Sequence, residues 1–404
     1  MKTLSKHFIA NNKNGIDVYL LEAHNTSYSG YDTFRKEFLD GMKQWNFLNL
    51  HVIVEDSPEQ QLVKKKEENI TYIYFPRIRE KRFSILEHYM KECIKPTNNM
   101  IFISNSFPAI FNVKTIRKLF PKAKIMHIVH DLPWLTIFNG NETAYMNYIQ
   151  SDENEILSPQ EDKFVRYCTY DIITSFREID MIISLCQSTY QLITDFYEIP
   201  SKKVRLIANG MKDYSMQYQE KKSYAIRKKY GLPKTELLIL LVGRLTYSKG
   251  ANKIEKLLDQ IAPSLNYKLI YAGSSDIYQW ISPKMTKSVI PLGFKKRSEM
   301  LELYSITQLG LFPSYHEQCS YVGIEFLMHG IPVIATSAYG VRDMFHPDNA
   351  FIVSNTIKPI TVEAIKSKRN HARKTYLKNY TNINMCKQYA SLIIELTSFS
   401  MGGM

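Results

Sequence analysis

One stretch of sequence decides the fold: Leu237-Leu-Ile-Leu-Leu-Val-Gly-Arg-Leu-Thr-Tyr-Ser-Lys-Gly250, an unbroken apolar run that leads into a basic loop. Such a run is typical of a strand buried on both faces of a parallel sheet. Gly243 lets the backbone turn after the strand, and Arg244 and Lys249 can then flank one anionic group. A helix that follows would point its partially positive N-terminus at the same place. The stretch predicts an anion-binding loop in an α/β protein.

Short apolar runs alternate with helix-length segments along the rest of the chain, which is the pattern of βαβ units and parallel sheets. The first series of predicted strands covers residues 16–21, 51–54, 71–75, 100–103, 125–129, 179–185 and 204–207. The second series covers residues 237–242, 267–271, 288–291, 309–312 and 331–335. Two series in 404 residues predict two doubly wound domains, with ligands bound beyond the carboxyl ends of the strands in the cleft between them.

A second motif runs from Pro313 to Gly330 and carries two glutamates, Glu317 and Glu325. We expect Glu317 in the loop after the strand at 309–312, and Glu325 on a helix that starts near Ser320. The first N–H groups of that helix form another anion site. A carboxylate one to two turns into the helix can accept both hydroxyl protons of a ribose diol. Each glutamate alone fits an ordinary ion-paired surface equally well.

Together the two motifs resemble the retaining nucleotide-sugar glycosyltransferases of family GT4, which have the two-domain GT-B fold. The resemblance rests on the segment from Gly243 to Gly250 and on the Glu317-x7-Glu325 spacing. It extends over roughly residues 120–345 and includes the turn at Asn209. It implies an α/β GT-B protein with two Rossmann-like domains facing each other across a cleft. The donor would be a nucleoside-diphosphate sugar, UDP- or GDP-linked, with no further cofactor.

The resemblance also implies roles for individual residues of the second domain. Arg244 and Lys249 match the pair that neutralises the departing nucleoside diphosphate, and Glu325 matches the glutamate that binds the ribose. Backbone N–H groups of Ser320 and Tyr321 would contact phosphate.

Glu317 matches the glutamate beside the donor sugar, but the sequence around it departs from the family. The family often has Glu-Gly-Phe-Gly, whereas this chain has Glu-Gln-Cys-Ser at 317–320, which looks partly like the Glu-Pro-Cys-Gly of starch and glycogen synthases. Side chains stand where backbone normally approaches the sugar, so the identity of the donor sugar does not transfer.

In the first domain, His130 ends the predicted strand at 125–129 and matches the family's histidine at the cleft. A lone histidine at a strand end is more often structural, and only the resemblance favours a role in catalysis. Ser29-Gly30 matches a glycine loop near the donor phosphates, although a plain turn fits as well. His127 points to the other face of the strand from His130, which argues against a metal pair.

The sequence has no Asp-x-Asp motif, so we predict no metal. Arg244, Lys249 and the helix start at Ser320 would stabilise the diphosphate instead. The acceptor hydroxyl would then attack from the same face, with Glu317 and His130 orienting the sugar. We expect transfer of a hexose or N-acetylhexosamine to a glycan, a lipid-linked glycan or a peptide. A nucleotide-sugar 2-epimerase and a catalytically silent binding scaffold stay open as alternatives.

Composition limits the other classes. A net charge of +13 favours polyanionic partners, such as an anionic membrane face. No nucleic-acid-binding motif is found, so no nucleic acid is expected. The five scattered cysteines indicate reduced thiols. No apolar run is long enough to cross a bilayer. We expect a cytoplasmic protein, with peripheral contact at the inner membrane face left open.

The predicted boundaries follow from the two strand series. Residues 1–207 would form the acceptor-side domain and residues 208–375 the donor domain. Residues 376–404 would form a C-terminal helix that packs back on the first domain.

Overall fold

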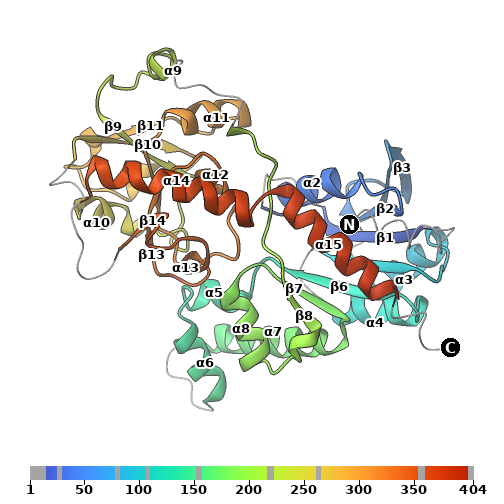
Figure 1. Cartoon of the computed structure of the whole chain (residues 1–404). Coiled ribbons are helices and arrows are strands. Elements are labelled where there is room, and N and C mark those ends of the chain that lie inside the picture. Colours follow the sequence, from blue (N-terminus) through green and yellow to red (C-terminus); the bar gives the residue numbers. More distant parts are fainter. Residues whose placement is uncertain are drawn as a thin grey trace.

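The computed structural model describes residues 15–24, 30–77, 82–105, 110–151, 157–215, 223–260, 265–353 and 360–398. Within these ranges the chain forms two sheets, each with helices around it (Figure 1). The α/β class and the two parallel-sheet domains predicted from the sequence are thus confirmed.

The first sheet has eight described strands in the order β3-β4-β2-β1-β5-β6-β7-β8, all parallel except the β3–β4 pair. They are β1 (Ile16–Ala23), β2 (Leu48–Ser57), β3 (Val63–Glu67), β4 (Ile70–Pro76), β5 (Met100–Ser104), β6 (Lys124–Val129), β7 (Met181–Ser184) and β8 (Val204–Leu206). The helices between them are α2 (Gly30–Met42), α3 (Arg82–Cys93), α4 (Ile110–Leu119), α5 (Pro133–Ile137), α6 (Glu142–Gln150), α7 (Pro159–Glu178) and α8 (Gln187–Gln191).

The second sheet has six described strands in the order β11-β10-β9-β12-β13-β14, all parallel. They are β9 (Leu237–Val242), β10 (Tyr267–Ala272), β11 (Val289–Pro291), β12 (Leu309–Phe312), β13 (Val333–Thr336) and β14 (Ala350–Val353). The helices of this domain are α9 (Ser223–Lys229), α10 (Ile254–Asp259), α11 (Arg297–Ile306), α12 (Tyr321–Met328), α13 (Val341–Met344) and α14 (Val362–Asn379). The last described helix of the chain is α15 (Asn382–Ser398).

Strand β1 explains why the predicted strands read as continuous apolar runs. Val18 and Leu20 pack into one core together with α2, whereas Tyr19 and Leu21 pack into a separate core together with α4. Both faces of the strand are therefore buried, as a doubly wound sheet requires. Because β1, β5 and β6 are parallel neighbours, their carboxyl ends lie at one edge of the sheet.

Two strands and one helix boundary differ from the sequence analysis. β3 reads Val-Lys-Lys-Lys-Glu, and its exposed lysines gave no apolar signal; β14 is a short strand at the other sheet's edge. The C-terminal helix expected over residues 376–404 begins later than predicted, at Asn382, and residues 399–404 lie outside the described residues. Tyr380 and Thr381 separate α14 from α15, because here the chain leaves the helix and bridges to Met211.

The chain passes between the domains twice, at the same place. Met211 donates its N–H to the Tyr380 carbonyl (2.9 Å) and accepts from the Asn382 N–H (2.9 Å). The carboxylate of Glu37, on α2, accepts from the Lys212 N–H and from the Asn382 side chain, each at 2.9 Å. The two crossing segments are therefore bonded to each other and to the first domain.

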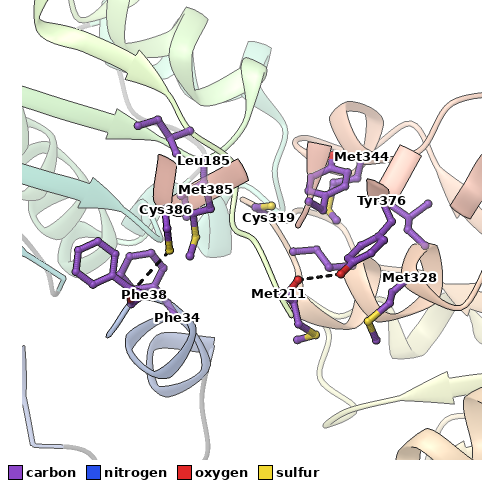
Figure 2. Packing of buried hydrophobic residues seen from close by; sticks show 14 of the residues in the cluster. Phe34, Phe38, Leu185, Met211, Cys319, Met328, Met344, Tyr376, Met385 and Cys386 are labelled. Carbon is purple, nitrogen blue, oxygen red and sulfur yellow. Dashed lines mark hydrogen bonds between the residues drawn. The ribbon is translucent and has the colours of Figure 1, made fainter. Parts of the chain in front are cut away.

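Helix α15 follows the second domain in sequence but packs on the first (Figure 1). The rings of Phe38 and Tyr389 meet edge to face at 5.2 Å. Figure 2 shows Cys386 against Phe38 on one side and the bond from Tyr376 to the Met211 carbonyl on the other. One apolar cluster thus runs from α2 through α15 and the crossing segments into the second domain.

Acid is expected to destabilise the fold through His127. This β6 residue is 2% exposed, and burial lowers the pKa of its imidazole from the ordinary 6.5 to about 3. Between those values the unfolded chain binds a proton that the folded protein does not. The free energy of unfolding therefore falls as the pH falls below about 6.5, by up to about 1.4 kcal/mol per pH unit.

The measurement is the denaturation midpoint between pH 7 and pH 5. His127→Phe is expected to depend less on pH than the parent protein. His88→Phe, at a side chain that is 72% exposed, serves as the control and should keep the parent's slope. An unchanged slope in His127→Phe would contradict the assignment.

Candidate active site

The loops after β9 and β12 lie against each other. The N–H of Tyr315 donates to the Ser248 carbonyl (3.0 Å). A Cβ added at Gly250 would lie 1.9 Å from the Pro313 carbonyl oxygen, so only glycine allows this approach. The adjacent parallel strands β9 and β12 end at the same edge, and their loops pack together as one unit.

This unit brings Lys249 and Glu317 together, two of the residues singled out in the sequence. Lys249 Nζ lies 2.7 Å from Glu317 Oε1, and the Ser314 hydroxyl donates to the same oxygen at 2.8 Å. The Glu317 side chain is 11% exposed and that of Lys249 is 48% exposed. A half-exposed ion pair contributes little to stability, about 0–1 kcal/mol. Its value lies in holding a cation and a carboxylate fixed at the sheet edge.

The backbone of Glu317 is held by the turn before α13. Its N–H donates to the Tyr339 carbonyl (3.0 Å). Gly340, the N-cap of α13, has a φ of 68°, and a Cβ there would lie 1.7 Å from the Glu317 carbonyl oxygen. The backbone of Glu317 therefore depends on the absence of a side chain at position 340.

Arg244 is exposed, and no described residue forms an ion pair or hydrogen bond with it. It leaves the end of β9 next to Gly243, in the same loop as Lys249. The structure does not join it to Glu317 or Glu325, so its side chain is available to an anion from outside the protein.

Ser320 and Tyr321 stand at the start of α12. Ser320 is the N-cap, and its hydroxyl accepts from the Gly323 N–H (3.4 Å). The Tyr321 hydroxyl is buried without a partner among the described residues, and burial raises its pKa. The backbone N–H groups of this turn can therefore serve a phosphate, and so can the Ser320 hydroxyl, which still has its own proton to donate.

Glu325 lies one turn into α12 and is held by two side chains. The Tyr304 hydroxyl donates to Oε2 (2.7 Å), and Arg297 Nη1 lies 3.9 Å from Oε1. Burial raises the pKa of the Glu325 carboxyl, while Tyr304 and Arg297 act in the opposite direction. Oε1 thus keeps acceptor capacity for a hydroxyl. Tyr304 and Arg297 were missed in the sequence because they lie in no motif.

In the first domain, His130 follows β6, and its Nε2 lies 2.6 Å from Asn105 Oδ1. The next residue is Asp131, whose carboxyl interacts electrostatically with Lys249 and Glu317 of the second domain. Burial raises the pKa of its carboxyl, Lys249 lowers it and Glu317 raises it further. The residue after His130 therefore lies within electrostatic range of the Lys249–Glu317 pair. Asp131 was missed, although its place beside His130 could have indicated it.

Gly30 begins α2 and is exposed. A Cβ there would meet nothing within 4 Å, so packing within the protein does not require glycine at this position. Ser29, its partner in the expected loop, lies outside the described residues.

The unusual residues after Glu317 connect the two domains. The side-chain oxygen of Gln318 accepts from the Thr189 hydroxyl (2.7 Å) of α8, and Gln318 is 6% exposed. Asn209 donates its side-chain N–H to the Cys319 carbonyl (2.8 Å). The Gln318 side chain is therefore used in the contact between the domains, whereas Cys319 contacts the segment around Asn209 through its backbone carbonyl.

The ends of β9 and β12 thus carry a fixed cation, a carboxylate and an arginine that pairs with no described residue, all in the second domain. Asp131 of the first domain, which follows His130, lies within electrostatic range of the first two. In the described part of the chain, no three His, Cys, Asp or Glu side chains gather as a metal cluster would. No helix described by the structure is both long and apolar enough to pass through a membrane. Two Rossmann-like domains with this arrangement define a GT-B protein.

Comparisons with known proteins agree with that class. Residues 223–380 match the family described as "Glycosyl transferases group 1". The uncharacterized glycosyltransferase MJ1607 of Methanocaldococcus jannaschii is 27% identical over 54% of this chain and 59% of its own length. The chain thus matches less than two thirds of that relative.

Solved structures support the fold. Sucrose-phosphate synthase from Thermosynechococcus elongatus superimposes with a TM-score of 0.69 at 15% identity, covering 95% of this chain and 100% of the other. Anabaena HepE in complex with UDP gives 0.68 at 14% identity, with 93% and 99% covered. Residues 223–380 are thus similar to the group 1 glycosyltransferases, and the fold of the chain is GT-B.

Proposed function

We propose that this chain is a retaining glycosyltransferase of GT4 type, which moves a hexose or N-acetylhexosamine from a nucleoside-diphosphate sugar to an acceptor hydroxyl. The observation that carries the proposal is the Lys249–Glu317 pair at 2.7 Å, within electrostatic range of Asp131, the residue that follows His130 in the first domain. The family match over the second domain and the fold support it.

In the proposed mechanism, Lys249, Arg244 and the first N–H groups of α12 stabilise the negative charge that develops on the departing diphosphate. Fixed groups of this kind need no reorganisation as charge develops, which makes electrostatic stabilisation the main contribution. Glu325 would hold the ribose through the oxygen that Tyr304 leaves open. Glu317 and His130 would orient the sugar while the acceptor attacks from the face that the diphosphate leaves.

The test combines binding with product analysis. UDP, GDP and ADP are compared in thermal-shift experiments, and a ligand at 100 times its Kd should add about 2.7 kcal/mol to the free energy of unfolding. We expect UDP to be the ligand, because the similar HepE structure is a UDP complex, and a related one holds UDP-glucose. Absence of binding by every nucleotide would contradict the proposal. Conversion of the donor without any acceptor would favour an epimerase, and binding without any turnover a silent scaffold.

Transfer is expected to continue undiminished in excess chelator. Arg244 and Lys249 supply the positive charge that a divalent cation would otherwise bring to the diphosphate. The measurement is the initial rate with and without EDTA. A rate that is abolished by EDTA and restored by Mn²⁺ would contradict a metal-independent reaction.

The proposed acceptor is a glycan, a lipid-linked glycan or a peptide. The net charge of +13 suits an acceptor presented at an anionic membrane, where each nearby cation contributes about 1 kcal/mol. Co-sedimentation with anionic vesicles that weakens as salt rises is the expected result for the lipid-linked case. Binding to neutral and anionic vesicles alike would argue against it.

A further inference from the structure

A row of hydrogen-bonded side chains leads to His130 from the interior of the first domain. Arg35 Nη1 donates to Glu22 Oε2 (2.7 Å), and Asn105 Nδ2 donates to the other oxygen, Glu22 Oε1 (2.9 Å). Asn105 Oδ1 then lies 2.6 Å from His130 Nε2. Glu22, Asn105 and His130 stand at the carboxyl ends of β1, β5 and β6, three neighbouring strands. The topology thus brings these residues together at one sheet edge.

The middle of the row is closed to water. Glu22 is 5% exposed and Asn105 is 2% exposed. Burial raises the pKa of the Glu22 carboxyl, while the charge and the hydrogen bond of Arg35 oppose it. A buried polar group without a partner is costly, so each of these groups must keep its bond.

The chemistry of each group fixes the direction of the whole row. An ionised carboxylate only accepts, so Asn105 must turn its Nδ2 toward Glu22. Its Oδ1 then faces His130 and can only accept, so the proton of the imidazole must be on Nε2. The other ring nitrogen, Nδ1, carries a lone pair and is bonded to no residue that the structure describes.

The ring itself is held in place by two aromatic side chains of α2. Its centroid lies 4.8 Å from that of Tyr31 and 5.0 Å from that of Phe34, the latter edge-on. Burial lowers the pKa of His130 to about 3, so the ring is neutral near pH 7. The packing therefore opposes rotation of the His130 ring, and the lowered pKa opposes its protonation, so the ring keeps the orientation that the structure shows.

We infer that Asn105 and Glu22 are positioning residues, which hold His130 as the Nε2–H tautomer and so present Nδ1 as a hydrogen-bond acceptor for a hydroxyl of the bound sugar. The second half of this inference rests on the proposed function, and the first half does not. A sugar hydroxyl donates to Nδ1 in this arrangement, whereas the opposite tautomer would present a donor, which the hydroxyl could meet only by turning to accept.

The decisive variant is Glu22→Gln, which changes neither size nor shape. Arg35 only donates, so it binds the oxygen of the new amide and leaves the NH₂ group facing Asn105. Asn105 must then turn round and donate to His130 Nε2, which moves the imidazole proton to Nδ1. Adding Asn105→Asp to this variant restores an acceptor beside Nε2, and so restores the original tautomer.

The first measurement needs no substrate. The full chain is labelled with ¹⁵N-histidine, and the tautomer of His130 is determined from long-range ¹H–¹⁵N couplings at pH 8, with the signal assigned by its loss in His130→Gln. We expect Nε2–H in the parent protein, Nδ1–H in Glu22→Gln and Nε2–H in the double variant. An Nδ1–H parent, or a Glu22→Gln protein that keeps Nε2–H, would overturn the inference. If Glu22→Gln does not fold, Asn105→Leu replaces it, with a mixture of tautomers expected and a single Nε2–H form contradicting.

The second measurement is kinetic. Glu22→Gln should lower kcat about 10- to 100-fold, as expected when a polar contact is replaced by a mismatch, without changing the thermal shift caused by UDP. The control is Glu395→Gln, which also removes a carboxylate paired with an arginine (Arg205, 3.1 Å) but lies away from the cleft; it should change neither quantity. Unchanged kcat in Glu22→Gln would refute the contact with the sugar. A parent protein without transfer activity would refute the proposed function and leave the tautomer result standing.

Discussion

Lys249→Ala is expected to lower the rate of sugar transfer about 10²- to 10³-fold, because the variant loses the fixed cation nearest to Glu317. The fold should survive, since the Lys249 side chain is 48% exposed and such pairs add little to stability. The effect should appear in kcat more than in the affinity for substrate, because charge on the diphosphate grows only as the bond to the sugar breaks.

Steady-state kinetics with the nucleotide identified by thermal shift measures this effect. Lys256→Ala is the matched control, an exposed lysine on α10 in the same domain that has no contact with Glu317. It should leave kcat unchanged. A near-normal rate in Lys249→Ala would remove the central element of the proposed site.

Gly340→Ala is expected to destabilise the protein by about 3 kcal/mol or more and to abolish transfer. Two causes act together at this position. The φ of 68° is strained for alanine, by about 1–2 kcal/mol, and the new Cβ would stand 1.7 Å from the Glu317 carbonyl oxygen. Backbone must therefore move, and Glu317 moves with it, away from Lys249.

Gly231→Ala separates these two causes. Its φ of 63° is nearly the same, but a Cβ there would meet nothing within 4 Å. Only the strain of the left-handed backbone applies, so a loss of about 1–2 kcal/mol with normal transfer is expected. Equal losses of stability in both variants, measured by chemical denaturation, would show that the contact with Glu317 is unimportant.

Much of the fold could be predicted because both faces of most strands are buried. β9 and β12 read as apolar runs for that reason, and the loops that follow them carry the motifs. β3 gave no such signal. It is an edge strand, and its lysines keep other chains from pairing with it. The same lysines remove the apolar pattern by which a strand is predicted from sequence.

The site was predictable only where residues stand in a motif. Lys249 and Glu317 follow predicted strands, and the structure brings them together. Glu22 and Asn105 are single polar residues at strand ends, 83 positions apart in sequence, and only the strand order makes them neighbours. In the sequence, Gln318 is only a departure from a glycine motif. Its contact with Thr189 could not be predicted, because that contact depends on how the two domains are placed relative to each other.

The packing of α15 on α2 has a consequence for biosynthesis. A ribosome that has made the first two hundred residues has not yet made the helix that covers Phe38. The apolar face of α2 in the N-terminal half therefore stays exposed to solvent until the segment that forms α15 leaves the ribosome. We expect a truncated chain ending before Asn382 to aggregate, and a synthetic peptide of residues 382–398 added in trans to rescue its solubility.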